Sequence, residues 1–196
     1  MEHTIGCGHS RKPLALTGPA LLLSSPLLLL ASPALAGPPA ATVQVLGTPS
    51  TETIVTIRPL SGSASRQGLK QFVGISGANS GSRGLSMNRV VIPPGGRAAP
   101  HRHVGSESAI YLVSGRVKTF FGPCLERTVI NQAGDFLYIP PGVPHMPQNL
   151  SSREPAIAIV SRTDAEEQEH VELIGAPGRV VAPGRVCSPG QGPPSW

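Results

Sequence analysis

Three histidines and one glutamate stand where they could bind a metal ion together. His101 and His103 are two residues apart, and on a strand, where side chains alternate between faces, both imidazoles would point to one side. Glu107 has the same parity and could face the same way, and His145 follows the rigid turn at 140–144. Three neutral imidazoles and a carboxylate suit a divalent ion such as Fe, Mn, Ni, Zn or Cu. On a six-coordinate metal they would leave two positions open for water, O₂ or a chelating substrate.

The same residues also have less specific explanations. A lone His-x-His pair on a strand is more often surface or hydrogen-bonded polar structure than a ligand pair, and a histidine after a Pro-Gly turn is a weaker signal still. Glu107 by itself could be an ordinary exposed carboxylate. His170 lies in an acidic segment near Glu169 and Glu172, and we expect it at the surface.

Short β-branched runs separated by Gly and Pro turns predict the elements that position these residues. The runs are 53–57, 71–75, 89–92, 109–113, 117–121, 128–130, 136–139 and 156–160. Such a regular succession of short strands indicates an all-β sandwich or small barrel. Acidic residues after Thr163 predict the start of one short helix. Residues 37–50 resemble a linker or irregular arm, and the Gly- and Pro-rich segment 175–196 predicts a disordered tail.

The overall composition agrees with a turn-rich β protein. The 196 residues include 23 Gly and 22 Pro, whereas charged residues make up 14% and aromatic residues 4%. Proline inside a helix costs about 3 kcal/mol, which argues against a helical bundle, and the low charge argues against a disordered polyelectrolyte. The net charge of +5 comes mostly from scattered arginines. That pattern argues against nucleic-acid binding.

The first 36 residues have the pattern of a secretory signal peptide. Arg11 and Lys12 precede an apolar stretch that ends in Ala34-Leu35-Ala36, an A-x-A cleavage pattern. Prolines interrupt the stretch, which disfavours a membrane span. We therefore expect a secreted or periplasmic protein of one domain, with no membrane partner after cleavage. Cys124 and Cys187 follow the signal, and the sequence leaves open whether they form a disulfide or two free thiols.

Two blocks of residues resemble the conserved motifs of the cupin superfamily. The second block, Gly134-x5-Pro140-x-Gly142-x2-His145-x3-Asn149, matches the second cupin motif at every position. The first block, Gly95-x5-His101-x-His103-x3-Glu107-x7-Gly115, departs in one place, because cupins usually have six residues before the closing Gly. The common spacing would put Ser108 at the Glu position. Glu107 is the only carboxylate nearby, so we assign it as the fourth ligand beside His101, His103 and His145.

The resemblance covers about residues 85–174 and implies an antiparallel jelly-roll β-barrel with the metal inside one mouth. Residues 37–84 would then form an N-terminal arm and early strands. Gly115 and Gly134 would serve turns, and Asn149 would be structural, bonding backbone near the site. Tyr111 and Tyr138 lie in predicted strands, where core packing is the expected role, and Arg102 should point away from the metal. The run 108–115 resembles small single-domain cupins described as sugar-isomerase-like or of unknown function, and cupins commonly form homodimers.

Three functions follow from this set of residues. The first is an exported metalloenzyme with dioxygenase- or isomerase-like chemistry on a small oxygen-bearing molecule. The second is a non-catalytic protein that binds the metal, a sugar or an organic acid with the same groups. The third, a barrel that has lost its metal, is disfavoured by the complete ligand set. Convergent polar groups beside an open metal position would favour the enzyme, whereas an apolar mouth would favour binding or an apolar substrate.

Overall fold

The structure is a computed structural model that describes residues 41–174 except 51, 167 and 169. The chain divides into two units, Met1–Leu35 and Ala36–Trp196, and every described residue belongs to the second. The predicted signal peptide and the predicted tail both lie outside the described residues. They stay predictions.

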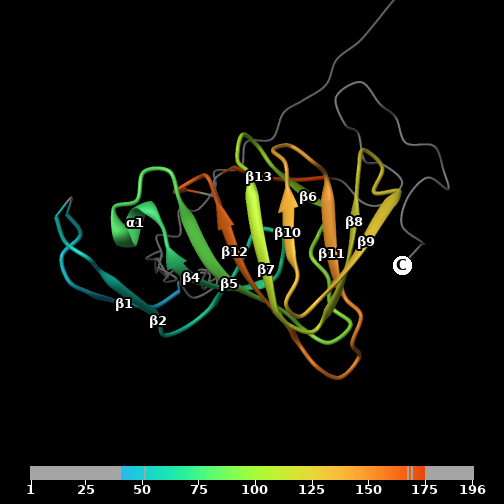
Figure 1. Ribbon diagram of the computed structural model, residues 1–196, viewed down its shortest axis with the longest axis horizontal. Helices are drawn as coiled ribbons and strands as arrows, with labels where there is room; N and C mark the ends of the chain where they lie inside the picture. The colour runs from blue at the N-terminus through green and yellow to red at the C-terminus, as the bar shows by residue number, and fades with distance from the viewer. Residues whose placement is uncertain (1–40, 51, 167, 169, 175–196) are drawn as a thin grey trace, which may run out of the picture. The chain divides into compact units, whose positions relative to one another are not determined.

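Strands dominate the described chain. In order, the elements are β1 (Val43–Leu46), β2 (Thr56–Pro59), β3 (Ser63–Ala64), β4 (Lys70–Ile75), α1 (Gly77–Ser80), β5 (Ser86–Ile92), β6 (His101–His103), β7 (Ser108–Ser114), β8 (Arg116–Phe121), β9 (Arg127–Gln132), β10 (Phe136–Ile139), β11 (His145–Asn149), β12 (Ala156–Arg162) and β13 (Val171–Leu173). The all-β prediction is confirmed. The helix α1 is a single turn, and it follows β4 (Figure 1).

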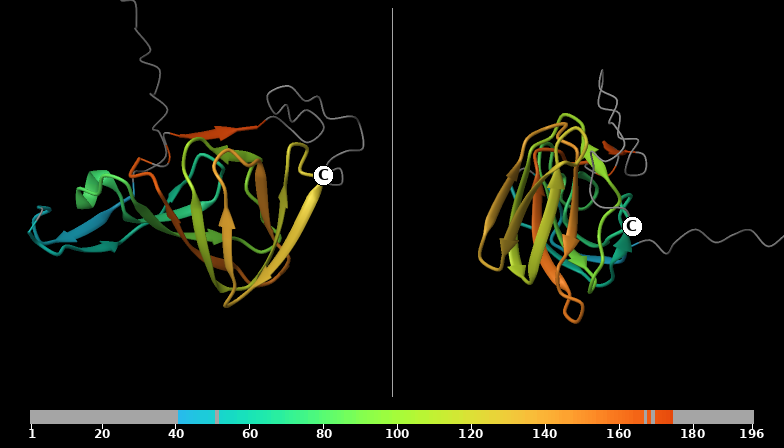
Figure 2. Two further views of the ribbon diagram at one scale, coloured as in Figure 1. Left: turned by 45° about the horizontal axis from the view of Figure 1, so that its top comes forward. Right: turned by 90° about the vertical axis from the view of Figure 1, so that its right-hand side faces the viewer.

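Two antiparallel sheets form the body of the fold. One has the order β10-β7-β12-β5-β4-β3, and the other has the order β13-β6-β11-β8-β9. Strands far apart in sequence are neighbours in both sheets, as in a jelly roll. Figure 2 shows the two sheets facing each other, and the pair β1–β2 forms a separate two-stranded sheet.

The sheets pack their alternate residues against each other. Strand β12 shows this alternation most clearly. Its buried residues are Ala156, Ala158, Val160 and Arg162, and the residues between them are half-buried. The apolar members of this row join residues of both sheets in one core, which comprises Leu69, Val90, Ile92, Ala98, Leu112, Val117, Ala156, Ala158 and Val160. A second cluster packs Phe120 and Met146 with Cys124 and Leu125.

Two tight turns lie at the same end of this interior, where Ala133 donates its backbone N–H to the carbonyl of Gly115 at 3.1 Å. Gly115 alone joins β7 to β8 at a φ of +92°, and a Cβ there would lie 2.7 Å from the Cβ of Ala156. Both observations require glycine at this position. Gly134, at a φ of +98°, serves the turn between β9 and β10, so both predicted turn roles are confirmed.

Two local predictions differ from the structure. The segment read as a linker contains β1, which pairs with β2 from Val43↔Pro59 to Leu46↔Thr56. The helix expected after Thr163 is wrong for the described residues, which form turns there. Asp164 accepts a hydrogen bond from the backbone N–H of Glu166 at 2.9 Å, a local bond that competes with helix formation.

The two tyrosines are also placed differently from the core role expected of them. Tyr111 and Tyr138 are both exposed on the outer face of the six-stranded sheet, beside Phe136. The ring of Tyr111 contacts that of Phe136 with a centroid separation of 4.8 Å. Inward positions on these strands carry smaller or aliphatic residues, which leaves the aromatic rings outside.

Candidate metal centre

Two neighbouring strands bring the three histidines together. His101 and His103 lie on β6 with both side chains buried and the intervening Arg102 turned outward. Arg102 donates to Glu172 of β13 at 2.7 Å, as strand alternation predicts. Strand β11 begins at His145, which pairs directly with His101. The five-stranded sheet therefore supplies all three imidazoles to one end of the interior.

The turn before β11 fixes the position of His145. Gly142, at a φ of +73°, donates its backbone N–H to the carbonyl of His103 at 2.8 Å. Gly122 donates to the carbonyl of Pro144 at 3.0 Å. The positive φ favours glycine at 142, and the two bonds attach the turn to β6 on one side and to the end of β8 on the other.

The imidazoles form a tight, buried cluster. Candidate ligand atoms of His101, His103 and His145 all lie within 4.8 Å of one another. The ring centroid of His101 is 5.0 Å from that of His103 and 4.2 Å from that of His145. All three residues are at most 4% exposed. Among the described residues this is the one group of three or more His, Cys, Asp or Glu side chains close enough to hold a metal ion.

Hydrogen bonds prepare the ring nitrogens for a metal. Nδ1 of His101 lies 2.8 Å from the carbonyl of Ala99, and Nδ1 of His145 lies 2.9 Å from the carbonyl of Val143. Since a carbonyl can only accept, each Nδ1 carries the proton, and Nε2 keeps its lone pair in the neutral ring. Both nitrogens of buried His103 have no hydrogen-bond partner. An unsatisfied buried imidazole is costly, and a metal ion is a partner that would satisfy it.

The surroundings keep all three rings neutral. Burial lowers the pKa of His101 well below its usual value, and its two neighbouring histidines lower it further. Burial, with the nearby charge of Arg162, lowers the pKa of His103 to about 2. Burial lowers the pKa of His145 to about 4, partly opposed by its bond to Val143. Neutral imidazole is the form that binds metals, so the residues fit a divalent ion at neutral pH.

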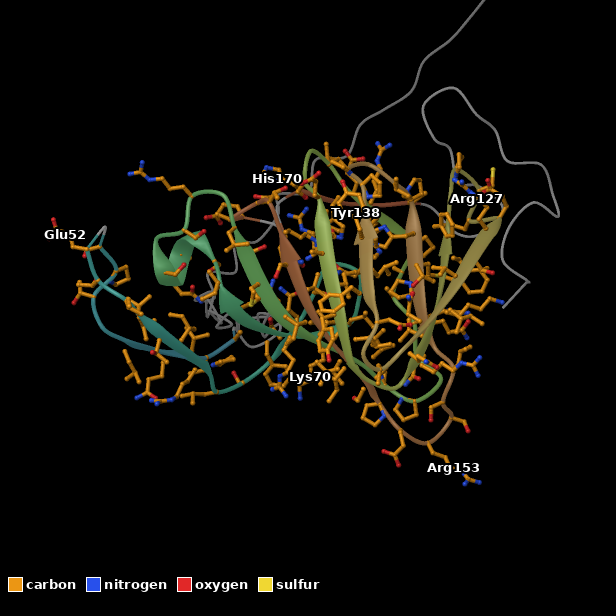
Figure 3. The ribbon with its side chains drawn as sticks, viewed as in Figure 1. Glu52, Lys70, Arg127, Tyr138, Arg153 and His170 are labelled. Carbon is orange, nitrogen blue, oxygen red and sulfur yellow. The ribbon has the colours of Figure 1, made fainter. Side chains whose placement is uncertain are left out.

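Glu107, the predicted fourth ligand, lies outside this cluster. It is exposed in the loop between β6 and β7. Its carboxylate accepts a hydrogen bond from the Tyr138 hydroxyl at 2.8 Å, and this bond raises the pKa of Tyr138. Tyr138 stands at the histidine end of β10 in Figure 3. Ser108, which begins β7, is the inward-facing neighbour and is 1% exposed. The common cupin spacing assigns this position to the ligand glutamate.

Sequence reasoning missed one charged residue of the site. Arg162 ends β12 and is 5% exposed. It has the parity of Ala156, Ala158 and Val160, so its side chain faces the same interior. Its charge is close enough to lower the pKa of all three histidines. Extending the predicted strand 156–160 by two residues would have placed it there.

Two cavities meet at this cluster. The interior one, of about 70 Å³, runs between the sheets and is lined by His101, His145 and Arg162 together with mainly aliphatic side chains. The second, of about 260 Å³, is lined by Phe121, Arg127, Tyr138 and Val143. Thr119, Leu137, Ile139 and His145 line both. His145 therefore borders both cavities.

Other predicted residues have structural roles. The side chain of Asn149 bonds the backbone, as predicted, but it does so at the end of the interior opposite the histidines, four residues along β11 from His145. His170 is exposed, as predicted, and its Nδ1 lies 2.6 Å from a carboxylate oxygen of Asp164. Cys124 is disulfide-bonded, and Cys187 lies outside the described residues.

Comparison with known proteins agrees with this fold and site. A family model described as "Cupin domain" matches residues 88–161, which include the three histidines. Germin-like protein 3-1 of Oryza sativa subsp. japonica is 32% identical over 87 residues, which are 43% of this chain and 38% of the rice protein. The oxalate decarboxylase of Lactobacillus farciminis, solved as a formate complex, is similar with a TM-score of 0.50 and 27% identity over 58% of this chain and 33% of that chain.

These findings define the class of protein. Residues 88–161 match a cupin domain, and this part of the chain carries three histidines that could bind a metal. The chain spans less than two fifths of the length of the two relatives above. In the described part of the chain, no helix is both long enough and apolar enough to cross a membrane.

Proposed function

We propose that this protein is an exported, metal-dependent cupin that acts on a small oxygen-bearing molecule, with dioxygenase- or isomerase-like chemistry. The observation that carries the proposal is the buried cluster of neutral imidazoles, in which both nitrogens of His103 have no hydrogen-bond partner. A site that served only packing would satisfy such groups.

His101, His103 and His145 would hold the metal. A divalent ion there would polarise oxygen atoms of a bound substrate and, where the ion is redox-active, support reaction with O₂. Imidazole ligands suit Fe, Ni, Zn and Cu, and a carboxylate ligand would extend the set to Mn. Glu107 as that carboxylate stays a prediction, since its exposed side chain bonds Tyr138. The chain's own contribution is to keep the rings neutral and to surround the ligands with aliphatic side chains that exclude water.

The alternative is a non-catalytic protein that binds a metal, a sugar or an organic acid. Polar groups beside the histidines favour the enzyme. Arg162, Thr119 and the pair Tyr138–Glu107 lie around the two cavities or at their rim. An acid–base reaction needs such groups near the metal-bound substrate, whereas storage of a metal does not.

Export and self-association extend the proposal. The signal-like first 36 residues support secretion or a periplasmic location. A homodimer is supported by the exposed aromatic face of the six-stranded sheet, where Phe136 is 81% exposed beside Tyr111 and Tyr138. Exposed apolar patches of this kind commonly mark interfaces. Light scattering would give a dimer mass for the protein and a monomer mass for Phe136→Glu.

Elemental analysis of untagged protein tests the metal site directly. We expect about one equivalent of a divalent metal in the purified protein or after reconstitution. His101→Ala and His145→Ala should each lose that equivalent, because they remove a ligand. His170→Ala is the matched control and should keep it, since His170 is exposed and bonds Asp164. No metal after reconstitution, or equal metal in all three variants, would exclude the proposed site.

A further inference from the structure

The turn between β3 and β4 buries a glutamine side chain in the interior of the fold. Alternate residues of this turn are buried, so that Ser65, Gln67 and Leu69 are at most 8% exposed, and the residues between them are exposed. Ser65 donates its backbone N–H to the carbonyl of Leu69 at 2.8 Å, and Gly68 donates to the carbonyl of Ser65 at 2.9 Å. A hydrogen-bonded turn therefore holds Gln67 in its inward position.

Backbone bonds connect this turn to one of the three histidines. The carbonyl of Gln67 accepts a hydrogen bond from the backbone N–H of Ala99 at 2.8 Å. The carbonyl of Ala99 in turn lies 2.8 Å from Nδ1 of His101. The first bond joins the β3–β4 edge of the six-stranded sheet to the segment that leads into β6 of the other sheet. Gln67 therefore lies beside the segment that orients a candidate metal ligand.

The side chain of Gln67 carries an acceptor that nothing in the described chain uses. It lines the interior cavity of about 70 Å³ together with His101 and His145. Gln67 is 4% exposed, and its Oε1 has no hydrogen-bond partner. Asn131 of β9 lines the same cavity, and its buried Oδ1 also has no partner. Because buried acceptors without a donor cost stability, these two oxygens favour a ligand that carries hydrogen-bond donors.

The surroundings of the cavity favour a donor without charge. Asp135 and Arg162 both line the cavity, so its lining includes one acidic and one basic side chain. A divalent metal on the histidines would add positive charge and repel an ammonium group. A hydroxyl can donate to an amide oxygen and still offer its lone pairs to a metal. The cavity has room for only a few water-sized groups, which limits the occupant to a few heavy atoms.

We propose that the interior cavity receives the hydroxyl-bearing end of a small hydroxylated substrate, and that Oε1 of Gln67 accepts a hydrogen bond from this hydroxyl beside the three histidines. The inference rests on the proposed function, because it names the substrate class of the same site. Gln67 is then a specificity-determining residue, since a substrate without the hydroxyl leaves its buried oxygen unpaired. The turn that carries Gln67 precedes the matched domain at 88–161, so the early strands contribute to the site.

Propan-2-ol and acetone provide the sharpest test, because they have the same heavy-atom skeleton and only the alcohol can donate a hydrogen bond. Each would be titrated into metal-free protein, with binding followed by ¹H–¹⁵N NMR shifts. Removing the metal excludes coordination of either oxygen from the measured affinity. We expect propan-2-ol to bind at least about fivefold more tightly than acetone, as one additional hydrogen bond to a buried acceptor requires. The side-chain amide signal of Gln67 should shift with the alcohol and less with the ketone.

Variants assign this preference to Gln67. Gln67→Met has nearly the same volume and no amide oxygen, so it should bind the two probes equally. Gln67→Glu keeps an acceptor and should retain the preference for the alcohol. Gln132→Met is the matched control and should behave as the parent does, because Gln132 is exposed and lines neither cavity. The side-chain shift in the parent protein tests the inference if the Gln67 variants fail to fold.

The outcomes separate this inference from the metal site. Metal content, measured in parallel, should stay at one equivalent in Gln67→Met, since the backbone of residue 67 makes the bond to Ala99. No binding of either probe, equal binding by the parent, or a preference that survives in Gln67→Met would overturn the hydroxyl subsite and leave the histidine site intact. Tighter binding of propan-2-ylammonium than of propan-2-ol to zinc-loaded protein would overturn the assignment to a neutral donor. A protein that takes up no metal but loses its alcohol preference in Gln67→Met would refute the metal proposal alone.

Discussion

Asn149 and His103 lie at opposite ends of the interior, and their buried side chains differ in hydrogen bonding. At one end, Asn149 donates from its amide to the carbonyls of Ile92, Pro93 and Glu154 and accepts from the backbone N–H of Ser151. At the other end, His103, Ser86 and Ser108 are equally buried and have no hydrogen-bond partner at their side-chain atoms. Strand β11 connects the two ends, from His145 to Asn149.

The contrast separates structural from functional polarity. The side chain of Asn149 joins the backbone at 92–93 to the backbone at 151–154, and each of its hydrogen bonds stabilises the fold. The unpartnered polar atoms at the histidine end cost stability in the metal-free protein, and a bound ligand would complete their bonding. Burial alone does not distinguish Asn149 from His103, Ser86 and Ser108, whereas the state of their hydrogen bonds does.

The largest expected effect is the loss of stability of the metal-free protein in acid. The unfolded chain takes up protons on its histidines near pH 6.5, while burial keeps the folded pKa values at about 2 for His103 and about 4 for His145. Below pH 6.5 the unfolded state therefore binds more protons, and each buried histidine removes about 1.4 kcal/mol of stability per pH unit until its folded pKa is reached. Urea unfolding from pH 7.5 to 4.5 would show stability falling with pH, and bound metal should oppose the loss near neutral pH. A flat profile would contradict the neutral cluster.

Removal of the structural asparagine should have the next largest effect. Asn149→Ala leaves three carbonyls and one N–H without their partner and should cost about 3 kcal/mol of unfolding free energy. The same substitution at Asn131, whose buried Oδ1 has no partner, should cost less than about 1 kcal/mol. Urea unfolding at pH 7.5 compares the two variants. Asn131 of β9 lies opposite Val117, at the same end as Asn149, so equal costs would show that the hydrogen bonds of Asn149 add no stability over an unpartnered amide.

Replacing His103 by leucine should change the unfolding free energy only slightly and should abolish metal binding. His103→Leu removes two unpartnered nitrogens from a buried position, so the metal-free variant should unfold within about 1 kcal/mol of the parent. Elemental analysis should find no bound metal in the variant. A large loss of stability in the metal-free state would show that His103 has a structural role like that of Asn149.

The smallest effect concerns the register of the first motif. Glu107→Ala should leave metal stoichiometry unchanged if the exposed carboxylate only bonds Tyr138, and it should lower metal affinity at least tenfold if it is a ligand. Ser108→Ala tests the alternative position in the same assay. Metal titration of the two variants decides between them, and loss of affinity in Glu107→Ala alone would establish the predicted four-ligand set.

The sequence predicted the strands and the three histidines because both depend on local rules. Alternation places His101 and His103 on one face, and the Pro-Gly turn directs His145 inward. Arg162 was not predicted, because a charged residue at a strand end is usually exposed, and its burial depends on the opposing sheet. The prediction for Glu107 assumed that the alternation of β6 continues through residue 107. The loop between β6 and β7 interrupts the alternation, and Ser108 faces inward instead. Counting residues along the chain cannot show where a loop interrupts the alternation of a strand.

The strand β13 has a consequence for how this protein can be divided. Strand β6 contains only three residues, two of which are the paired histidines, and its second neighbour is β13, with Val171 opposite His103 and Leu173 opposite His101. The recognisable cupin domain ends at residue 161. A polypeptide trimmed to that boundary would keep His101, His103 and His145, and yet it would leave β6, which holds two of them, as a free sheet edge. The part of the chain that supports the three histidines therefore extends beyond the matched domain, and loss of the residues after Arg162 would remove the strand that pairs with His101 and His103.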